Sequence, residues 1–323
     1  MKFRGPQALP NRPQKTMACP TVQLIAFLEG LPILEIDNGA LENIRAAQNP
    51  DGGWPYRRGG SWTEPTVYAL LAHQAGLTTA PRSAETLAWL CAAQQPDGGW
   101  TPRPSVDQST WVTALVALLP PETIGAARHA RAVKWLLGLS GMESSPLLRL
   151  SVFLRDGKLP DAPDLNGWPW FPGTAAWVTP TCLGVLALKK CYWRQPSTDL
   201  RERIDQAQTF LLARRCADGG WNHGSARALG YNSDSYPETT GQALLALAGR
   251  DPAKLEAGFR LAQRFLREQR SAAGAAWLRL GLLAHQQLPA DIPLATMPCR
   301  TLPDTALTLL AAAAEQGCNV FLE

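Results

Sequence analysis

Two kinds of apolar pattern alternate along this chain, and both have the period of a helix. In the first kind, apolar residues cover almost the whole surface of the expected helix, which is typical of a buried helix. In the second kind, charged residues occupy one face, as at 128–139, 200–213 and 255–267. Because strand-like alternation is nearly absent, the pattern predicts an all-α protein of alternating inner and outer helices. The buried kind begins with Pro, Thr or an acidic residue and covers residues 64–72, 179–187, 237–245 and 303–310, with a looser form at 107–115.

A short motif, called the clasp, follows several of the helical runs. It reads Gln-Asn-Pro-Asp-Gly-Gly-Trp at 48–54 and Gln-Gln-Pro-Asp-Gly-Gly-Trp at 94–100, with a weaker copy at 216–221 and a partial one at 166–168. The first two copies lie 46 residues apart (97 − 51), a period that indicates repeated helical units. Glycine ends a helix without steric cost, Gln should bind backbone at a neighbouring helix end, and Trp should hold the turn in place. One active site does not need several copies, so we predict that the clasp is structural.

The alternation and the period together predict a closed ring of helical hairpins, a single-domain α/α toroid whose inner helices surround a cavity. We expect the helices that start at Glu64, Thr179, Glu238 and Asp304 to be inner ones. Residues 1–20 contain four prolines and should form an extended arm, with the toroid over residues 21–323. The irregular stretch at 140–165 reads as an insertion or a degraded repeat within it.

Composition narrows the function classes. The chain has 323 residues, 46% of them hydrophobic, and a net charge of +4 without a long run of one sign, which argues against nucleic acid as a partner. Seven scattered cysteines without a Cys-x-x-Cys pair indicate reduced thiols and a cytoplasmic protein. Residues 1–20 have no apolar h-region, so we expect them not to be a signal peptide, and the sequence has no stretch of 18 apolar residues that would predict a membrane span. The 12 tryptophans leave peripheral contact with a membrane as an option, and the oligomeric state stays open.

The complete clasps, with an aromatic and an aliphatic residue upstream as in Trp89 and Leu90, resemble the QW repeats of squalene–hopene cyclases and related triterpene cyclases. Protein prenyltransferase β-subunits share the same α/α toroid. The resemblance covers about residues 40–315, although only two clasps are complete. It implies a toroid that acts on a hydrophobic isoprenoid or another lipid. Squalene–hopene cyclases carry two toroid-type domains, whereas this chain has the length for one.

Such cyclases start their reaction with a carboxylic acid in an Asp-x-Asp-Asp motif at the start of an inner helix, and this chain has no such motif. The corresponding stretch is residues 236–239, where Glu238 is the only carboxyl group, and Asp234 lies just before it. Glu238 and Asp234 are therefore the predicted catalytic acids, because burial beside hydrogen-bonding neighbours keeps a proton on a carboxyl group. Glu64 and Asp304 occupy matching helix starts in other repeats. The alternative is that all four carboxyl groups only cap helices or complement their dipoles.

Aromatic residues gather near the same helix starts. Aromatic faces stabilise carbocations, which terpene cyclisation requires, although the same side chains could simply pack loops onto the ring. The loops around Trp62, Trp170 and Tyr236 would converge at one mouth of a regular ring. The aromatic set comprises Trp62, Trp111, Trp168, Trp170, Trp177, Tyr231 and Tyr236, and the predicted substrate-binding residues are Trp62, Glu64, Trp111, Trp170, Trp177, Tyr236 and Asp304.

A zinc site is the main alternative chemistry, since prenyltransferase β-subunits bind zinc through an Asp-x-Cys and a later His. Here Asp304 is followed by Ala306 where the Cys should be, and His285 with Cys299 makes only two ligands. We therefore predict no metal and no cofactor. The sequence favours a terpene-cyclase-like enzyme with acid-initiated chemistry. A non-catalytic toroid that binds a lipid or a partner protein stays open, and a prenyltransferase-type subunit is a third option.

Overall fold

A computed structural model describes residues 38–77, 81–145, 147, 150–151, 153–154, 166–224, 227–228, 231–268, 270–292 and 297–323. The predicted arm of residues 1–20 lies outside the described residues, as does most of the stretch at 140–165. Among the described residues, no helix combines the length and the apolar character that a membrane span requires.

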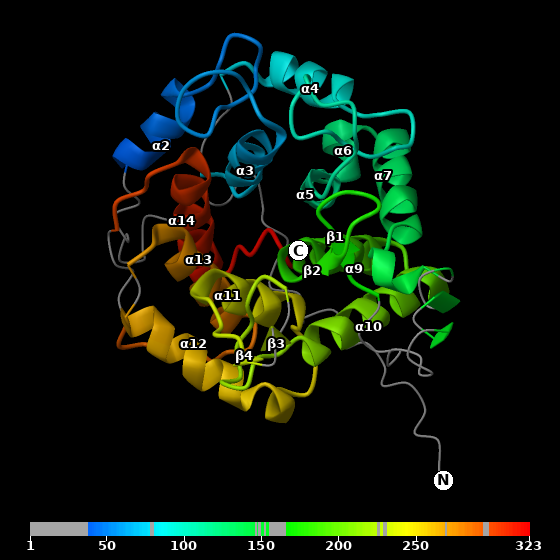
Figure 1. Cartoon of the computed structure of the whole chain (residues 1–323). Helices are drawn as coiled ribbons and strands as arrows, with labels where there is room; N and C mark the ends of the chain where they lie inside the picture. Colours follow the sequence, from blue (N-terminus) through cyan, green and yellow to red (C-terminus); the bar gives the residue numbers. More distant parts are fainter. Residues whose placement is uncertain are drawn as a thin grey trace.

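Six of the described helices form a closed inner ring. Each packs against the next, and the last packs against the first, so the chain is an all-α toroid (Figure 1). The four helices that we predicted to be inner are α3, α9, α11 and α14, and that prediction is confirmed. In ring order the inner helices are α3 (Thr63–Gln74), α5 (Val112–Leu118), α9 (Val178–Arg194), α11 (Pro237–Ala246), α13 (Ala272–Leu283) and α14 (Leu302–Glu315).

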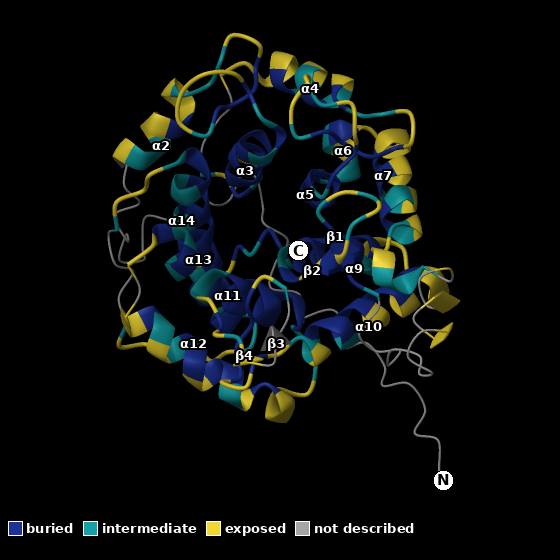
Figure 2. Cartoon of the chain, in the orientation of Figure 1, coloured by how far each residue is buried: buried dark blue, intermediate teal, exposed yellow. Residues whose placement is uncertain are grey.

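The outer layer follows the charged pattern, and its helices are buried only on the side that faces the ring (Figure 2). The predicted charged helices agree with α7, α10 and α12 to within about two residues. The outer helices are α2 (Asn38–Ala46), α4 (Ser83–Ala92), α6 (Pro121–Ile124), α7 (Ala126–Gly138), α10 (Thr198–Ala213) and α12 (Glu256–Glu268). Short 3₁₀ turns (η1, Met142–Ser144; η3, Pro252–Lys254) and two hairpins complete the described elements: β1 (Trp168–Pro169) with β2 (Ala176–Trp177), and β3 (Arg227–Ala228) with β4 (Tyr231–Asn232).

Each clasp tryptophan ties the end of an outer helix to the start of the next inner helix. The ring nitrogen donates a hydrogen bond to a carbonyl near the outer helix end, and the backbone N–H donates to a threonine hydroxyl in the first turns of the inner helix. The partial clasp makes the same bonds, so Trp168 is a full structural copy. The ring-nitrogen bonds join Trp54 to Ile44 (2.7 Å), Trp100 to Leu90 (2.7 Å), Trp168 to Leu136 (2.9 Å) and Trp221 to Leu211 (2.6 Å), and the threonines are Thr66, Thr113, Thr181 and Thr240.

The remaining clasp residues shape the turn itself. Asp97 Oδ1 accepts the backbone N–H of Gly99 at 2.9 Å and the hydroxyl of Ser109 at 2.7 Å. Gly98, not Gly99, holds the left-handed conformation (φ +98°), and a Cβ there would lie 2.8 Å from the Arg131 carbonyl oxygen. Gly99 is required for space instead, because its Cβ would lie 2.5 Å from that of Ser109. As predicted, Gln94 reaches a neighbouring helix: its Nε2 donates to the Arg128 carbonyl at 3.0 Å.

The carbonyl two residues after each clasp tryptophan accepts a backbone hydrogen bond from the start of a neighbouring inner helix. These bonds bring the starts of four inner helices, α14, α3, α5 and α9, to one end of the ring, which we call the clasp end. They join Leu302 N to Tyr56 O (2.8 Å), Thr63 N to Pro102 O (2.9 Å), Trp111 N to Trp170 O (2.9 Å) and Val178 N to His223 O (2.8 Å).

Candidate active site

Aromatic side chains gather at the clasp end because the chain places them at two repeated positions. Trp62, Trp111, Trp177 and Tyr236 are the N-cap residues of α3, α5, α9 and α11. Tyr56, Trp170 and His223 each lie two residues after a clasp tryptophan. We call these seven residues the aromatic collar.

The two kinds of collar position contact one another in pairs. Tyr56 lies 5.5 Å from Trp62, Trp170 lies 5.0 Å from Trp111, and His223 lies 5.1 Å from Tyr236, all between ring centroids. All five aromatic residues predicted to bind substrate therefore lie at the clasp end. Sequence reasoning missed Tyr56 and His223, although their shared distance from the clasp tryptophan could have revealed them.

Two other aromatic residues considered from the sequence lie outside the collar. Trp168 is buried as a clasp residue, and Tyr231 is 78% exposed in β4. Within the collar, the guanidinium carbon of Arg103 lies 4.7 Å from the centroid of the Trp62 ring. One collar ring thus already binds a cation on its face, which is the interaction that a carbocation would use.

Glu64 is the acid whose surroundings the fold changes most. It is the second residue of α3, half-buried, and the Tyr56 hydroxyl donates a short hydrogen bond to its Oε2. Burial raises the pKa of Glu64, and the negative charge of Asp304 raises it further, while the Tyr56 hydrogen bond opposes both effects. This carboxyl group therefore keeps its proton to a higher pH than an ordinary glutamic acid.

Tyr68 lies one helical turn beyond Glu64 on α3 and is only 3% exposed. Burial raises its pKa well above the usual range, and the charges of Glu64, Tyr56 and Glu238 raise it further.

The other predicted acids lie in different settings. Glu238 is the second residue of α11 and half-buried, and Ser271 Oγ donates to its Oε1 at 3.4 Å. Asp234 is exposed in the loop before α11. Asp304 completes a capping box at the start of α14, where its Oδ2 accepts the backbone N–H groups of Arg300 and Thr301 at 2.9 Å each. Asp304 thus completes the cap of α14, and its negative charge also contributes to the raised pKa of Glu64.

The residues considered for zinc are held by different helices. His285 Nε2 bonds the Leu244 carbonyl oxygen of α11 at 2.8 Å. Cys299 lies near α14, with its Sγ 3.8 Å from the Thr308 hydroxyl. Within the described ranges, no three His, Cys, Asp or Glu side chains are grouped as metal ligands would be. His285 therefore serves the end of an inner helix.

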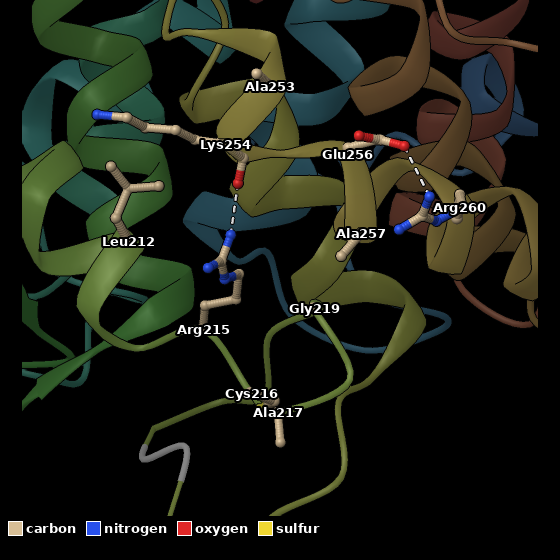
Figure 3. Close-up of a pocket in the computed structure, with 10 residues that line it drawn as sticks. All are labelled: Leu212, Arg215, Cys216, Ala217, Gly219, Ala253, Lys254, Glu256, Ala257 and Arg260. Carbon is tan, nitrogen blue, oxygen red and sulfur yellow. Dashed lines mark hydrogen bonds and ion pairs between the residues drawn. The ribbon is translucent and has the colours of Figure 1, made fainter.

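Two surface grooves lie between a clasp and an outer helix. One, of about 610 Å³, lies between the clasp at 216–221 and the start of α12 (Figure 3). The other, of about 470 Å³, lies between the clasp at 94–100 and α7. Both repeat the same relation between a clasp and an outer helix, so they follow from the repeat and are poor candidates for an active site. The first groove is lined by Leu212, Arg215, Cys216, Ala217, Gly219, Ala253, Lys254, Glu256, Ala257 and Arg260.

The sequence matches no model of a protein family and no curated protein. The fold is similar to solved structures of MstE, a type II terpene cyclase from Scytonema. The structure without ligand has a TM-score of 0.48 and 18% identity, over 86% of this chain and 78% of that one. A variant in complex with its substrate, geranylgeranyl dihydroxybenzoate, has a TM-score of 0.47 and 17% identity, over 86% of this chain and 76% of that one. At this level, the similarity shows neither the substrate nor the chemistry of this chain.

Proposed function

We propose that this protein is a terpene-cyclase-like enzyme that acts on a hydrophobic isoprenoid inside the ring, by acid-initiated carbocation cyclisation or isomerisation. The observation that carries the proposal is Glu64: a half-buried carboxyl group with a raised pKa, held by Tyr56 at the aromatic end of a ring of apolar helices. An alkene is a weak base, so the group that protonates it must be a neutral acid out of contact with bulk water.

In the proposed reaction, Glu64 transfers its proton to an alkene carbon. A C–H bond forms, the π bond breaks, and the positive charge moves to the neighbouring carbon. A second alkene of the same chain then attacks this cation to close a ring, and transfer of a proton from an adjacent carbon to water restores a double bond. The product is an isomer of the substrate, so no oxidant or metal takes part. Collar rings stabilise the cation on their faces, and Tyr56 is the route by which water returns a proton to Glu64.

Glu238 is the second proposed acid, because it is the half-buried second residue of the inner helix α11 and follows the collar residue Tyr236. Asp234 is the weaker of the two acids that the sequence favoured, since its side chain is exposed to water in the loop before α11. The capping role of Asp304 makes it a contributor to the charge around Glu64, not a donor.

The test is turnover in heavy water. Purified protein is incubated with farnesyl and geranylgeranyl diphosphates, their alcohols and squalene, and products are analysed by mass spectrometry. We expect a cyclic isomer that carries one carbon-bound deuterium from the solvent. Prenyl compounds that copurify with the protein but are never converted would favour a lipid-binding toroid. If the protein neither binds nor converts any of these compounds, the proposal is refuted.

Contact with a membrane surface is a further part of the proposal, because a membrane would hold such substrates. The described residues between 147 and 154 are helical, and four large apolar side chains there face solvent: Leu147 (80% exposed), Leu150 (53%), Phe153 (45%) and Leu154 (74%). Exposed apolar faces of this kind insert at the headgroup boundary.

Flotation with phosphatidylcholine–phosphatidylglycerol vesicles tests this contact. The wild type should float with the vesicles, and the double variant Leu147→Ser, Leu154→Ser should remain in the soluble fraction. Tyr231→Ser is the matched control, because Tyr231 is equally exposed at another part of the surface. Equal flotation of all three proteins would contradict the contact.

A further inference from the structure

The chain turns back beneath the ring after the last inner helix. At the end of α14, Gly317 adopts a left-handed conformation (φ +94°), and the N–H of Cys318 bonds the Ala313 carbonyl at 3.0 Å. This is the geometry with which glycine reverses a chain at a helix end. Residues 318–323, which we call the tail, then run into the middle of the ring, where Figure 1 places the last residue.

Two inner helices hold the tail in place. The ring of Phe321 is fully buried and lies 5.3 Å from that of Trp277 on α13. From α9, Lys190 Nζ donates a hydrogen bond to the Val320 carbonyl at 2.6 Å, and both residues are buried. Because α11 lies between α9 and α13 in the ring, the tail crosses from one side of the interior toward the other.

The bond from Lys190 is unusual in its setting. Burial lowers the pKa of Lys190 to about 8, which means that the fold disfavours the charge. A buried ammonium group is costly unless hydrogen bonds satisfy it. The Lys190 ammonium group meets this need with its hydrogen bond to the tail. The position of the tail is therefore specified by the fold.

The collar and the tail lie at opposite ends of the ring. The start of α14 belongs to the clasp end, because Leu302 N bonds the carbonyl of Tyr56. The tail follows the other end of the same helix. As α14 has 14 residues, the two ends are separated by about 21 Å at a rise of 1.5 Å per residue.

We propose that the tail is the floor of the substrate site and that Phe321 is the residue that limits the length of the isoprenoid. This inference rests on the proposed function, in which the isoprenoid enters the ring at the clasp end. Each added isoprene unit gains binding free energy only while it leaves water for an apolar surface. Affinity should therefore rise with chain length until the far end of the isoprenoid meets the Phe321 ring.

Equilibrium dialysis with radiolabelled farnesol, geranylgeraniol and geranylfarnesol tests the floor. Phe321→Leu shortens the side chain but keeps it apolar, so the tail should stay in place, and Phe321→Trp enlarges it. The matched control is Phe210→Leu, because Phe210 is also fully buried but lies on the outer helix α10. Thermal melts of all three variants show whether each is folded at the assay temperature.

In the wild type, affinity should stop rising at one chain length. In Phe321→Leu, the affinity for the next longer prenol, divided by the affinity for the prenol of that length, should increase by about tenfold or more. This is the range that one apolar group in a pocket gives. It should decrease in Phe321→Trp and stay unchanged in Phe210→Leu. Tight binding with the same length preference in all four proteins would refute the floor alone. If neither the wild type nor any variant binds a prenol, the proposed function is refuted and the floor with it.

Discussion

Replacing Trp100 by alanine is expected to lower the free energy of unfolding by about 3–5 kcal/mol, the usual cost of removing a large buried aromatic side chain. Trp100 is fully buried, and its ring nitrogen satisfies the Leu90 carbonyl near the end of α4 at 2.7 Å. The variant leaves a cavity between two layers of helices and an unpaired carbonyl beside it. Chemical denaturation followed by circular dichroism measures the change.

Trp177→Ala is the matched control for this substitution. Trp177 is also a tryptophan beside an inner helix start, but it belongs to the collar and is 37% exposed. A partly exposed side chain without a clasp bond should cost about 1 kcal/mol or less. A Trp100→Ala protein as stable as Trp177→Ala would show that the clasp does not hold the layers together.

The repeat made the fold predictable, because each clasp marks a junction between an outer and an inner helix. The inner helix that escaped prediction, α13, lacks the Pro or Thr start and is not preceded by a clasp. It also contains Arg279, which is buried with an ion pair to Glu315 of α14. An arginine interrupts the apolar pattern that identified the other inner helices, and only the tertiary partner explains why it is tolerated.

The collar was predictable for the same reason, since its residues occupy fixed positions relative to the clasp and the helix starts. The choice among the acids was not. Glu64 and Glu238 are both second residues of inner helices and look alike in sequence. Closure of the ring changes the setting of Glu64: burial raises its pKa, and the charge of Asp304, distant in sequence, raises it further. Local sequence carries no information about such a neighbour.

Glu64→Gln is expected to abolish the proposed reaction, with a loss of at least the roughly 10²–10⁴-fold that general acids contribute. Glutamine keeps the shape and can still accept the Tyr56 hydrogen bond, but it has no acidic proton. Glu238→Gln and Asp304→Asn are the comparison variants. Retained turnover in Glu64→Gln together with lost turnover in Glu238→Gln would transfer the role to Glu238.

The stability of the same variant gives an independent test of the raised pKa. A carboxyl group whose pKa is raised by folding contributes stability below its unfolded pKa, and this contribution is lost as the pH rises through its folded pKa. Glutamine does not titrate, so Glu64→Gln should gain stability relative to the wild type between acidic and neutral pH. Asp304→Asn should instead lose about 0.3–1 kcal/mol at neutral pH, because it removes a negative charge from the first turn of α14 while keeping an acceptor oxygen for the capping box. Unfolding free energies measured from acidic to neutral pH decide between these outcomes: if the stability of Glu64→Gln relative to the wild type does not rise over this range, folding does not raise the pKa of Glu64 and the group is not the proposed proton donor.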